Sequence, residues 1–414
     1  MRRYLVARLA QNVLTYFLFL TMVFFLLDAQ PGDFGNSYIN DPRLTAEQRA
    51  LLRARLGLDK PVYERYLIWM SNFLQGEFGV SFSNFPRPVL DVIAERAPRT
   101  IILFLTATIC SFYFGFMAGK VLAWKRGGWL EYIATVGGVG LYTVFTPWFG
   151  LMMILLFAYT LGVFPIGKFI DPVLWRGASE PITANFIFLR LLITGFVGGA
   201  LLLGWLLYVR RLDPIRRRRL RSVGVIVILL LIVVAWLVYS YVIADQAGWW
   251  QQARPAGPLA MLSYLFTRGA IRYAADILWH LVLPVTTLTL ISFAGQMLLT
   301  RNSMLETLRE DYILTARAKG LPERVVRDKH AARNAMLPVL TAFILSLAFV
   351  LDGGVITETI FSWPGMGLTL LTAAQTEDIP MAVGALVFTG AMALTAHLVA
   401  DVLYAYLDPR IRYA

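Results

Sequence analysis

The chain is short of charged residues and has almost no cysteine. Of its 414 residues, 15% are charged and 58% are hydrophobic, whereas soluble domains carry about 25% charged residues. The one cysteine, Cys110, lies in an apolar run, where we expect a small buried side chain. A single cysteine excludes an intrachain disulfide and a metal site built from several cysteines. The composition indicates an integral membrane protein.

The chain also lacks the motifs of nucleotide and metal chemistry. Its nearest approach to a phosphate-binding loop, "GFMAGKV" at 115–121, has three residues between its glycines where the motif needs four, and no Ser or Thr follows Lys120. The histidines, His280, His330 and His397, have no metal-binding spacing, and no G-x-S-x-G sequence occurs. We therefore expect no catalytic residue, no bound cofactor and no metal in this chain.

Long apolar runs dominate the sequence. A helix that crosses the hydrocarbon core of a bilayer needs about 20 residues. Eight runs meet this length, at about 5–27, 99–122, 131–161, 185–209, 222–244, 277–300, 337–357 and 381–404. The first is longer than the core of a signal peptide and no cleavage site follows it, so we expect it to remain as a helix. The pattern predicts an all-α, polytopic membrane protein.

The basic residues predict which side of the membrane each loop faces. The net charge of +12 is compatible with a nucleic-acid partner, but the basic residues gather in short loops between apolar runs, as insertion requires. The clusters are Arg2, Arg3 and Arg8, then Lys125 and Arg126, then "RRLDPIRRRRLR" at 210–221, then the segment after the sixth run, then Arg410 and Arg412. All fall on one side, which predicts cytoplasmic termini and no nucleic acid.

Two segments outside the spans carry their own helix signals. The external loop 28–98 has Thr45 and Gln48 spaced as a capping box and Gly57 placed as a helix stop, which predicts a small helical cap. The stretch "TETIFSWPGMGLTLLTAAQTEDIP" at 357–380 is too short and broken to cross a membrane. We expect a re-entrant or surface element on the outer face, because protein or a water-filled cavity must cover its backbone.

Polar residues distinguish the spans from one another. The run 223–243 has no charged residue and no proline, which predicts a lipid-facing helix. Later spans contain polar residues, which usually face a bundle interior or a watery path. Gln296 and Asp352 are our candidates for a translocation path. The alternatives are a helix–helix hydrogen bond for Gln296 and a polar helix end beside a glycine pair for Asp352.

A basic, alanine-rich segment, "TARAKGLPERVVRDKHAARNAMLP" at 315–338, lies between two spans. The pattern predicts one helix over 302–319, capped by Asn302 or Ser303 and stopped at Gly320, and a second helix that begins near Pro322. Small residues at 316, 318 and 320 keep the turn slim, and basic side chains at 317, 319, 324 and 327 surround it. Two readings stay open: contact with anionic lipid head groups, and docking to a soluble partner.

The same segment resembles the EAA loop of permease subunits in binding-protein-dependent ABC importers of the dipeptide, oligopeptide and nickel type. The matching residues are Asp311, Tyr312, Thr315, Ala316, Arg317, Ala318, Lys319, Gly320, Leu321, His330, Ala331, Arg333, Asn334, Ala335, Leu337 and Pro338. Four further stretches look like signatures of the B-type subunit, in the same order: "QPGD" after the first span, residues 56–82, 358–367 and 404–412. The resemblance covers roughly 1–168 and 275–414.

The resemblance implies a type I ABC importer permease fold in a bacterial or archaeal cytoplasmic membrane. It implies that the EAA loop seats in a cleft of a cytoplasmic ATPase subunit, which uses ATP. The coupling residues would be Thr315, Ala316, Arg317, Ala318, Lys319, Gly320, Leu321, Pro322, Arg324, His330, Arg333 and Asn334. It also implies a second, C-type permease as a heterodimer partner, an external substrate-binding protein and lipid. The cargo would be a peptide, with nickel, oligosaccharides and opines as alternatives.

The sequence departs from this family in one region. Family members usually have six spans, whereas residues 169–275 add two spans and the Arg-rich loop, giving about eight. The predicted organisation is listed by range: 1–27 first span, 28–98 external helical loop, 99–168 core spans, 169–275 inserted pair, and 276–414 core spans with the EAA loop at 301–337. An ion-coupled secondary transporter and a membrane scaffold are the other functions considered. The first would need paired halves and intramembrane carboxylates, and no internal repeat is found.

Overall fold

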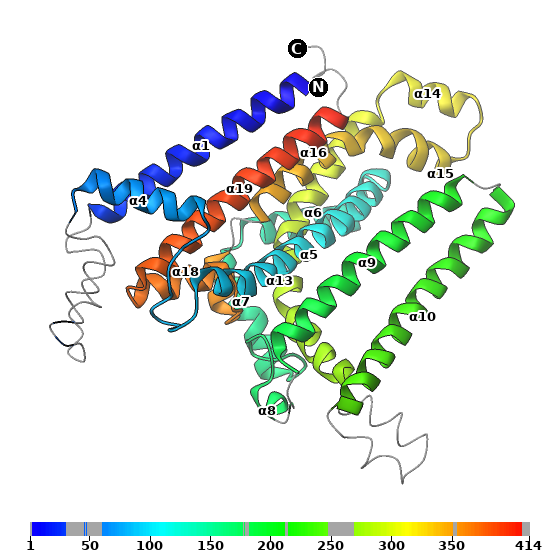
Figure 1. Ribbon diagram of the computed structural model, residues 1–414. Helices are drawn as coiled ribbons and strands as arrows, with labels where there is room; N and C mark the ends of the chain where they lie inside the picture. Colours follow the sequence, from blue (N-terminus) through cyan, green and yellow to red (C-terminus); the bar gives the residue numbers. More distant parts are fainter. Residues whose placement is uncertain are drawn as a thin grey trace, which may run out of the picture. The chain divides into compact units, whose positions relative to one another are not determined.

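The computed structural model describes residues 2–29, 45, 47, 60–176, 178, 182–211, 214–246, 269–350 and 354–407. Within these ranges the regular structure is helical, apart from an isolated β-bridge between Val80 and Pro88. The helices in Figure 1 are α1 (Arg2–Asp28), α4 (Val62–Leu74), α5 (Val89–Trp124), α6 (Trp129–Thr143), α7 (Thr146–Met153), η1 (Ile154–Thr160), α8 (Pro172–Trp175), α9 (Ala184–Arg210), α10 (Pro214–Gln246), α13 (Ala270–Thr307), α14 (Asp311–Ala318), α15 (Glu323–Val325), η3 (Val326–Ala331), α16 (Ala332–Val350), α17 (Val355–Ile360), α18 (Met366–Gln375) and α19 (Ile379–Leu407).

The chain forms two compact units. Unit 1 consists of Met1–Gly162 with Leu283–Ala414, and unit 2 is Val163–Val282. Helix α13 runs through the boundary between them.

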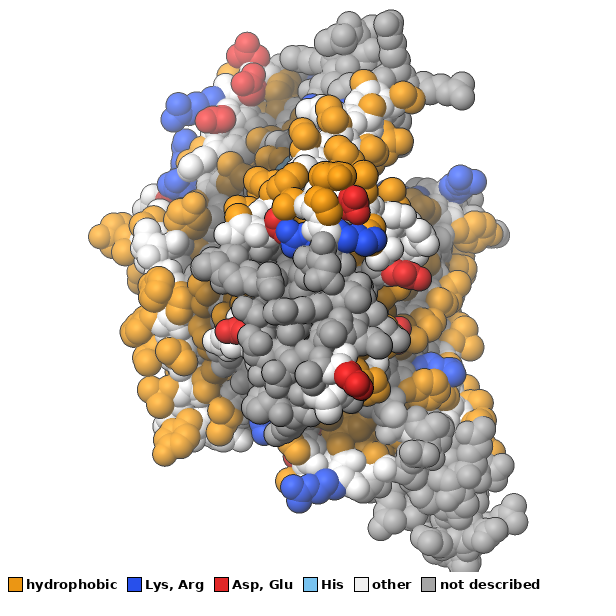
Figure 2. All heavy atoms as spheres, turned by 60° about the vertical axis from the view of Figure 1, so that its left-hand side comes forward, with side chains coloured by type: hydrophobic (Ala, Val, Ile, Leu, Met, Phe, Trp, Pro, Cys, Tyr) orange, Lys and Arg blue, Asp and Glu red, His pale blue; other side chains and the backbone are white. Residues whose placement is uncertain are grey.

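Six helices in the described ranges are long and apolar enough to cross a membrane. They are Val6–Leu26, Val89–Trp124, Ala184–Arg210, Leu220–Val242, Ala270–Thr307 and Ile379–Val402. Each overlaps a predicted span, so the all-α membrane fold is confirmed. Hydrophobic side chains cover wide areas of the described surface, with charged side chains in small groups (Figure 2).

The predicted span 131–161 is helical but bent in the structure. Helix α6 ends at Thr143, and the chain is helical again over Thr146–Thr160, in α7 and η1. The axis of this second stretch differs from that of α6 by 107°. Pro147 stands in the first turn of α7, where its missing N–H is tolerated and where it disfavours continuation of a preceding helix. The apolar pattern is uninterrupted across the bend and gives no sign of it.

The predicted span 337–357 corresponds to α16, which begins five residues earlier and is described as far as Val350. It is not among the six helices that meet the length and hydropathy test. In the external loop, α4 is a helix of the predicted cap, while Gln48 and Gly57 lie outside the described residues.

Helices α1 and α19 pack antiparallel in unit 1 (Figure 1). Asn12 donates to the carbonyl of Leu394 at 3.2 Å, and the Tyr16 hydroxyl donates to that of Val387 at 3.1 Å. Beside these contacts, α4 packs in a cluster with α1 and α19. The buried residues of the cluster are Leu20, Val23, Met70, Val383 and Val387. The first helix therefore has a structural role within the bundle.

Helix α5 begins ten residues before the predicted boundary at 99. Pro88 precedes its first turn, and the added turns bury Val89, Val92, Ile93 and Ala97. This spacing places them on one helical face, which packs on Met366, Ala373, Met381 and Ala385. The predicted span was taken from a continuous run of apolar residues, and the polar residues 95, 96 and 99 interrupt that run. The amphipathic first turns of α5 were therefore missed.

Glycines let α5 approach α13 at backbone distance. A Cβ added at Gly119 would lie 2.5 Å from the carbonyl oxygen of Met297 and 2.6 Å from Cβ of Thr300. One turn earlier, a Cβ at Gly115 would lie 2.6 Å from Cβ of Gln296. Small residues four apart are a common means of close helix packing in membranes. The "GFMAGKV" sequence thus forms a helix contact.

The segment 354–378 folds as two short helices covered by protein. The carboxylate of Glu358, which is 0% exposed, accepts hydrogen bonds from Thr100 Oγ1 at 2.7 Å and from the Leu368 amide at 2.9 Å. Burial raises the pKa of Glu358 above its ordinary value. The Trp363 indole donates to the carbonyl of Arg99 at 3.1 Å. These contacts join α17 and α18 to α5.

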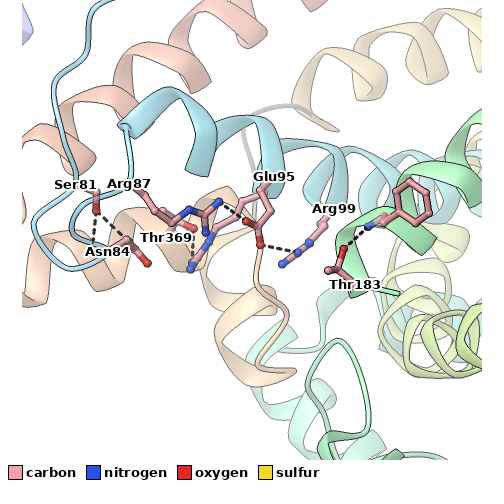
Figure 3. A network of polar contacts seen from close by, with 9 residues as sticks. Ser81, Asn84, Arg87, Glu95, Arg99, Thr183 and Thr369 are labelled. Carbon is pink, nitrogen blue, oxygen red and sulfur yellow. Dashed lines mark hydrogen bonds and ion pairs between the residues drawn. The ribbon is translucent and has the colours of Figure 1, made fainter. Parts of the chain in front are cut away.

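A second polar network surrounds the start of α5 (Figure 3). Glu95 accepts from Arg87 at 2.6 Å and from Arg99 at 2.9 Å, and Arg96 donates to Thr369 at 2.9 Å. The network includes residues from the external loop, α5 and α18.

Asp378 fixes the external loop to the start of α19. Its Oδ2 accepts from Ser81 Oγ at 2.6 Å and from the amide and Oγ of Ser83 at 2.8 and 2.6 Å. Burial raises the pKa of Asp378, but the hydrogen bonds from the two serines lower it more, so the pKa lies below its ordinary value. The carboxylate form is therefore the one that holds the loop.

Unit 2 contains the hairpin of α9 and α10. Trp205 donates to the carbonyl of Leu220 at 3.2 Å, and the Arg190 guanidinium lies 4.6 Å from the centroid of the Tyr239 ring. The span Leu220–Val242 is only 11% buried, the lowest share among the six. Its exposed aliphatic surface agrees with the predicted lipid-facing helix. At the other end of the unit, Asp276 accepts from the Trp175 indole at 2.8 Å.

We expect Gly119→Ala to lower the stability of the purified subunit by about 1–3 kcal/mol, because the new methyl group overlaps the α13 backbone. Gly137→Ala is the matched control, since no atom lies within 4 Å of its added Cβ and alanine favours a helix. Thermal unfolding in detergent measures both. A Gly119→Ala subunit as stable as the control would contradict the close packing.

We expect Asp378→Asn to destabilise the subunit at pH 7 by about 1–3 kcal/mol, because the neutral amide cannot accept all of the serine hydrogen bonds. A lowered folded-state pKa contributes stability above the unfolded pKa of about 3.9, and this contribution is lost as pH falls. The difference between wild type and variant should therefore shrink as pH falls through about 4. The measurement is the unfolding of wild type and variant at pH 7 and at a pH below about 4. Glu377→Gln, at the exposed neighbouring position, is the control. A difference in stability that does not depend on pH would contradict the prediction.

Candidate functional site

The segment between α13 and α16 forms a helix, a sharp turn and a second helix. The predicted helix 302–319 is wrong in its start: α13 continues to Thr307, a turn follows, and α14 begins at Asp311 after the extended Glu310. Asn302 and Ser303 lie inside α13, and Ser303 Oγ donates to the carbonyl of Ala335 at 2.8 Å. This tie to α16 and the buried side chain of Met304 carry α13 past the predicted cap. We call residues 308–334 the loop.

Gly320 ends α14 as predicted. Its φ is +70°, a conformation that side chains with a Cβ disfavour. Its amide donates to the carbonyl of Arg317 at 2.9 Å, and the amide of Leu321 donates to that of Ala316 at 3.3 Å. These two bonds satisfy the free carbonyls at the helix end. Pro322 then precedes α15, so the second helix begins where it was predicted.

An apolar core lies beneath the turn. Its buried members are Ala123, Met304, Ile313, Ala316, Val326, Ala331, Ala332 and Ala335. The five alanines among these eight residues let α14, η3 and the end of α5 come close together. Ala316 is 5% exposed, so its small size serves packing inside the protein, whereas residues 318 and 320 are exposed.

Charged residues of the loop divide into two groups. Arg317 pairs with Glu323 at 3.5 Å, and Asp328 accepts from Arg327 at 2.9 Å and lies 3.1 Å from Lys120 Nζ. The hydrogen bond from Arg327 is the main cause that lowers the pKa of Asp328 to about 2. The second group is exposed and basic: Lys319, Arg324, Lys329 and Arg333.

The predicted coupling residues lie together on the loop, and most of them are exposed. Exposed members are Thr315, Arg317, Ala318, Lys319, Gly320, Pro322, Arg324, Arg333 and Asn334; Leu321 and His330 are half-buried and Ala316 is buried. Asn334 donates to the Tyr312 hydroxyl at 2.8 Å, which links the two arms of the loop. The outer surface of the turn is open, since no atom lies within 4 Å of a Cβ added at Gly320.

Of the two candidate path residues, the structure describes Gln296. Gln296 is half-buried, its Cβ faces Gly115, and its Oε1 is buried without a hydrogen-bond partner among the described residues. Asp352 lies outside the described residues. A role for either in translocation stays a prediction.

The sequence did not point to the residues that hold the loop from α5, α6 and α13. Lys120 and Trp124 contact the loop from α5. Glu131 accepts from Arg301 Nε at 2.9 Å and from the Gly127 amide at 2.5 Å, which fixes the α5–α6 turn to α13. Apart from Gly127 and Glu131, these pairs are far apart in sequence, so no local pattern marks them. The one available signal was a charged or indole side chain at the end of an apolar run.

Comparison with known proteins matches both ends of the chain. Residues 1–104 match a family described as the N-terminal part of binding-protein-dependent transport system membrane components, and residues 215–413 match the binding-protein-dependent transport system inner membrane component family. The di/tripeptide permease protein DppB of Pseudomonas aeruginosa is 31% identical over 415 residues, covering 100% of this chain and 99% of that protein. This chain belongs to that inner membrane component family.

Other relatives of the permease extend over the same length. The dipeptide permease DppB of Escherichia coli K12 is 28% identical over 413 residues, with 100% of this chain and 99% of that protein covered. The oligopeptide permease AppB of Bacillus subtilis is 27% identical over 414 residues, with 100% of both chains covered. The chain is therefore a membrane component of a bacterial binding-protein-dependent transport system.

We expect Gly320→Asn to preserve the loop and Gly320→Val to distort it. Both side chains have space, but asparagine tolerates positive φ while a β-branched residue there is strained by about 1–2 kcal/mol. Limited trypsin digestion, which cuts at Arg317, Lys319 and Arg324, should cleave the valine variant faster than wild type and the asparagine variant at the wild-type rate. Equal cleavage of both variants would contradict a turn controlled by backbone conformation.

Proposed function

We propose that this permease forms part of the translocation path of an ATP-driven importer of peptides. The proposal for peptides is supported by the full-length relatives, which are named as permease proteins of di/tripeptide, dipeptide and oligopeptide transport systems. ATP hydrolysis is assigned to separate cytoplasmic subunits, and this chain supplies the path and the coupling loop. It binds no cofactor of its own in this proposal.

The observation that carries the coupling role is the contrast between the two sides of the loop. Inside, the turn rests on a packed core whose members Ile313 and Val326 are 0% exposed. Outside, Lys319, Gly320 and Arg324 are exposed. A rigid, basic and slender projection of this kind suits an acidic cleft of a partner protein. A loop that only rested on lipid head groups would need basic residues but no rigid core beneath them.

The proposed assembly contains three other kinds of protein. ATPase subunits bind the loop on the side that the basic clusters predict to be cytoplasmic. A second permease completes the path as a heterodimer, and a substrate-binding protein delivers peptide at the opposite face. The membrane lipid contacts the exposed aliphatic surface of α10. A secondary transporter would need no soluble ATPase, so copurification separates the two functions.

We expect the double variant Lys319→Glu with Arg324→Glu to retain about a tenth or less of the copurifying ATPase. Each reversal replaces an attraction to an acidic cleft by repulsion, and two such changes of about 1 kcal/mol each exceed a tenfold change in affinity. The measurement is the ratio of ATPase to permease after affinity purification from membranes of cells that express the whole transport system.

The matched control is Lys125→Glu with Arg126→Glu. These residues are exposed and basic and lie in the turn after α5, outside the loop. The control should copurify with the wild-type amount of ATPase. If wild-type permease brings down no ATPase, or both double variants lose it equally, the proposed role of the turn is wrong.

A further inference from the structure

The end of α5 contacts the loop through an indole ring shared by two arginines. The Cζ atoms of Arg317 and Arg327 lie 5.8 and 5.9 Å from the centroid of the Trp124 ring. Both distances are within the reach of a cation–π interaction. Arg317 belongs to α14 and Arg327 to η3, so one ring contacts both arms of the loop, before and after Gly320.

One helical turn earlier, α5 makes an ion pair with the same loop. Lys120 Nζ lies 3.1 Å from Asp328 Oδ1, and the Lys120 side chain is 16% exposed. Positions 120 and 124 share a helical face because they are four residues apart. Between them in sequence, Ala123 is 1% exposed and belongs to the core beneath the turn. Lys120 and Trp124 therefore form a clamp on the loop.

The opposite end of α5 is joined to the helical pair α17–α18. Thr100 donates to Glu358 at 2.7 Å, Arg96 donates to Thr369 at 2.9 Å, and the carbonyl of Arg99 accepts from Trp363 at 3.1 Å. Along its length, α5 lies directly on the backbone of α13 at Gly119. At a rise of about 1.5 Å per residue, the 24 steps along the helix from Thr100 to Trp124 span about 36 Å. A single helix thus contacts the loop and α17–α18.

We propose that Lys120 and Trp124 are positioning residues that transmit displacement of the loop, through α5, to α17 and α18. This inference rests on the proposed function, because an ATPase must move the loop. Turns bound α14 at both ends, at 308–310 and at Gly320. Without the clamp, the apolar core at Ala123 still joins α14 to α5, but we expect a displaced α14 to rotate at these turns while α5 stays in place. With the clamp, α14, η3 and α5 move as one body.

The test measures movement at α18 in the assembled complex of permease, partner permease and ATPases. With Cys110 replaced by alanine, spin labels are attached at Tyr63→Cys on α4 and Thr376→Cys at the end of α18, both exposed. The distance between the labels is measured by double electron–electron resonance in two conditions. One is without nucleotide, and the other is with ATP and vanadate, which together trap the closed ATPases. The amount of bound ATPase is measured in the same samples.

We expect a nucleotide-dependent distance change in wild type that is lost in Lys120→Glu and in Trp124→Leu, with the bound ATPase unchanged. The charge swap Lys120→Glu with Asp328→Lys, and the ring-preserving Trp124→Phe, should restore most of the change. Lys125→Glu, an exposed charge reversal next to Trp124, should behave as wild type. Rescue by the swap would assign the effect to the ion pair between the two positions, and the unchanged amount of bound ATPase separates this effect from a loss of docking.

Three results would overturn the inference. One is a wild-type distance change in both single variants, and another is no change in wild type although ATPase is bound. The third is loss of the change in the single variants only together with loss of ATPase, which would make the clamp part of docking. Absence of ATPase from the wild-type complex would instead refute the proposed function.

Discussion

The packed core beneath Gly320 is the contact on which the rest of the structure's function depends. Ala316, Val326 and Ala123 bring three helical segments together at distances that larger side chains would prevent. The core gives the exposed turn a defined shape, and in our proposal the clamp of Lys120 and Trp124 carries a displacement of the turn to α5. In that proposal, a loop with the same surface charges and no core would bind a partner without passing its displacement to the bundle.

The sequence was sufficient for features that depend on local chemistry. Runs of about 20 apolar residues predicted the spans, and the order of Gly320 and Pro322 predicted the end of one helix and the start of the next. Local patterns failed where distant contacts decide. The start of α5 at Val89 depends on packing against α18 and α19, and α13 passes Ser303 because that side chain is tied to Ala335. The bend after Thr143 lies next to Pro147, and a proline disfavours a helical conformation at the residue before it. The prediction did not consider this effect inside a long apolar run.

The candidate site was predicted at the level of the segment and only partly at the level of single residues. The alanines looked like surface features that kept the turn slim, yet Ala316 is buried. Lys120 appeared only in a failed nucleotide motif, and its partner Asp328 is more than 200 residues away. The bounds of compact unit 2, Val163–Val282, are similar to those of the predicted insertion, 169–275. The α9–α10 hairpin of this unit exposes a wide apolar surface. The proposed domain boundaries and an accessory role for the hairpin await tests of their own.

The central claim is that the turn at Gly320 projects into the cytoplasm and is covered by an ATPase. The most direct test places one cysteine at Lys319 in a Cys110→Ala background and labels it with a membrane-impermeant maleimide in right-side-out and inverted vesicles. The account predicts labelling only in inverted vesicles, and protection there when the ATPase subunits are present. Labelling in right-side-out vesicles, or labelling that the ATPase subunits do not change, would contradict it.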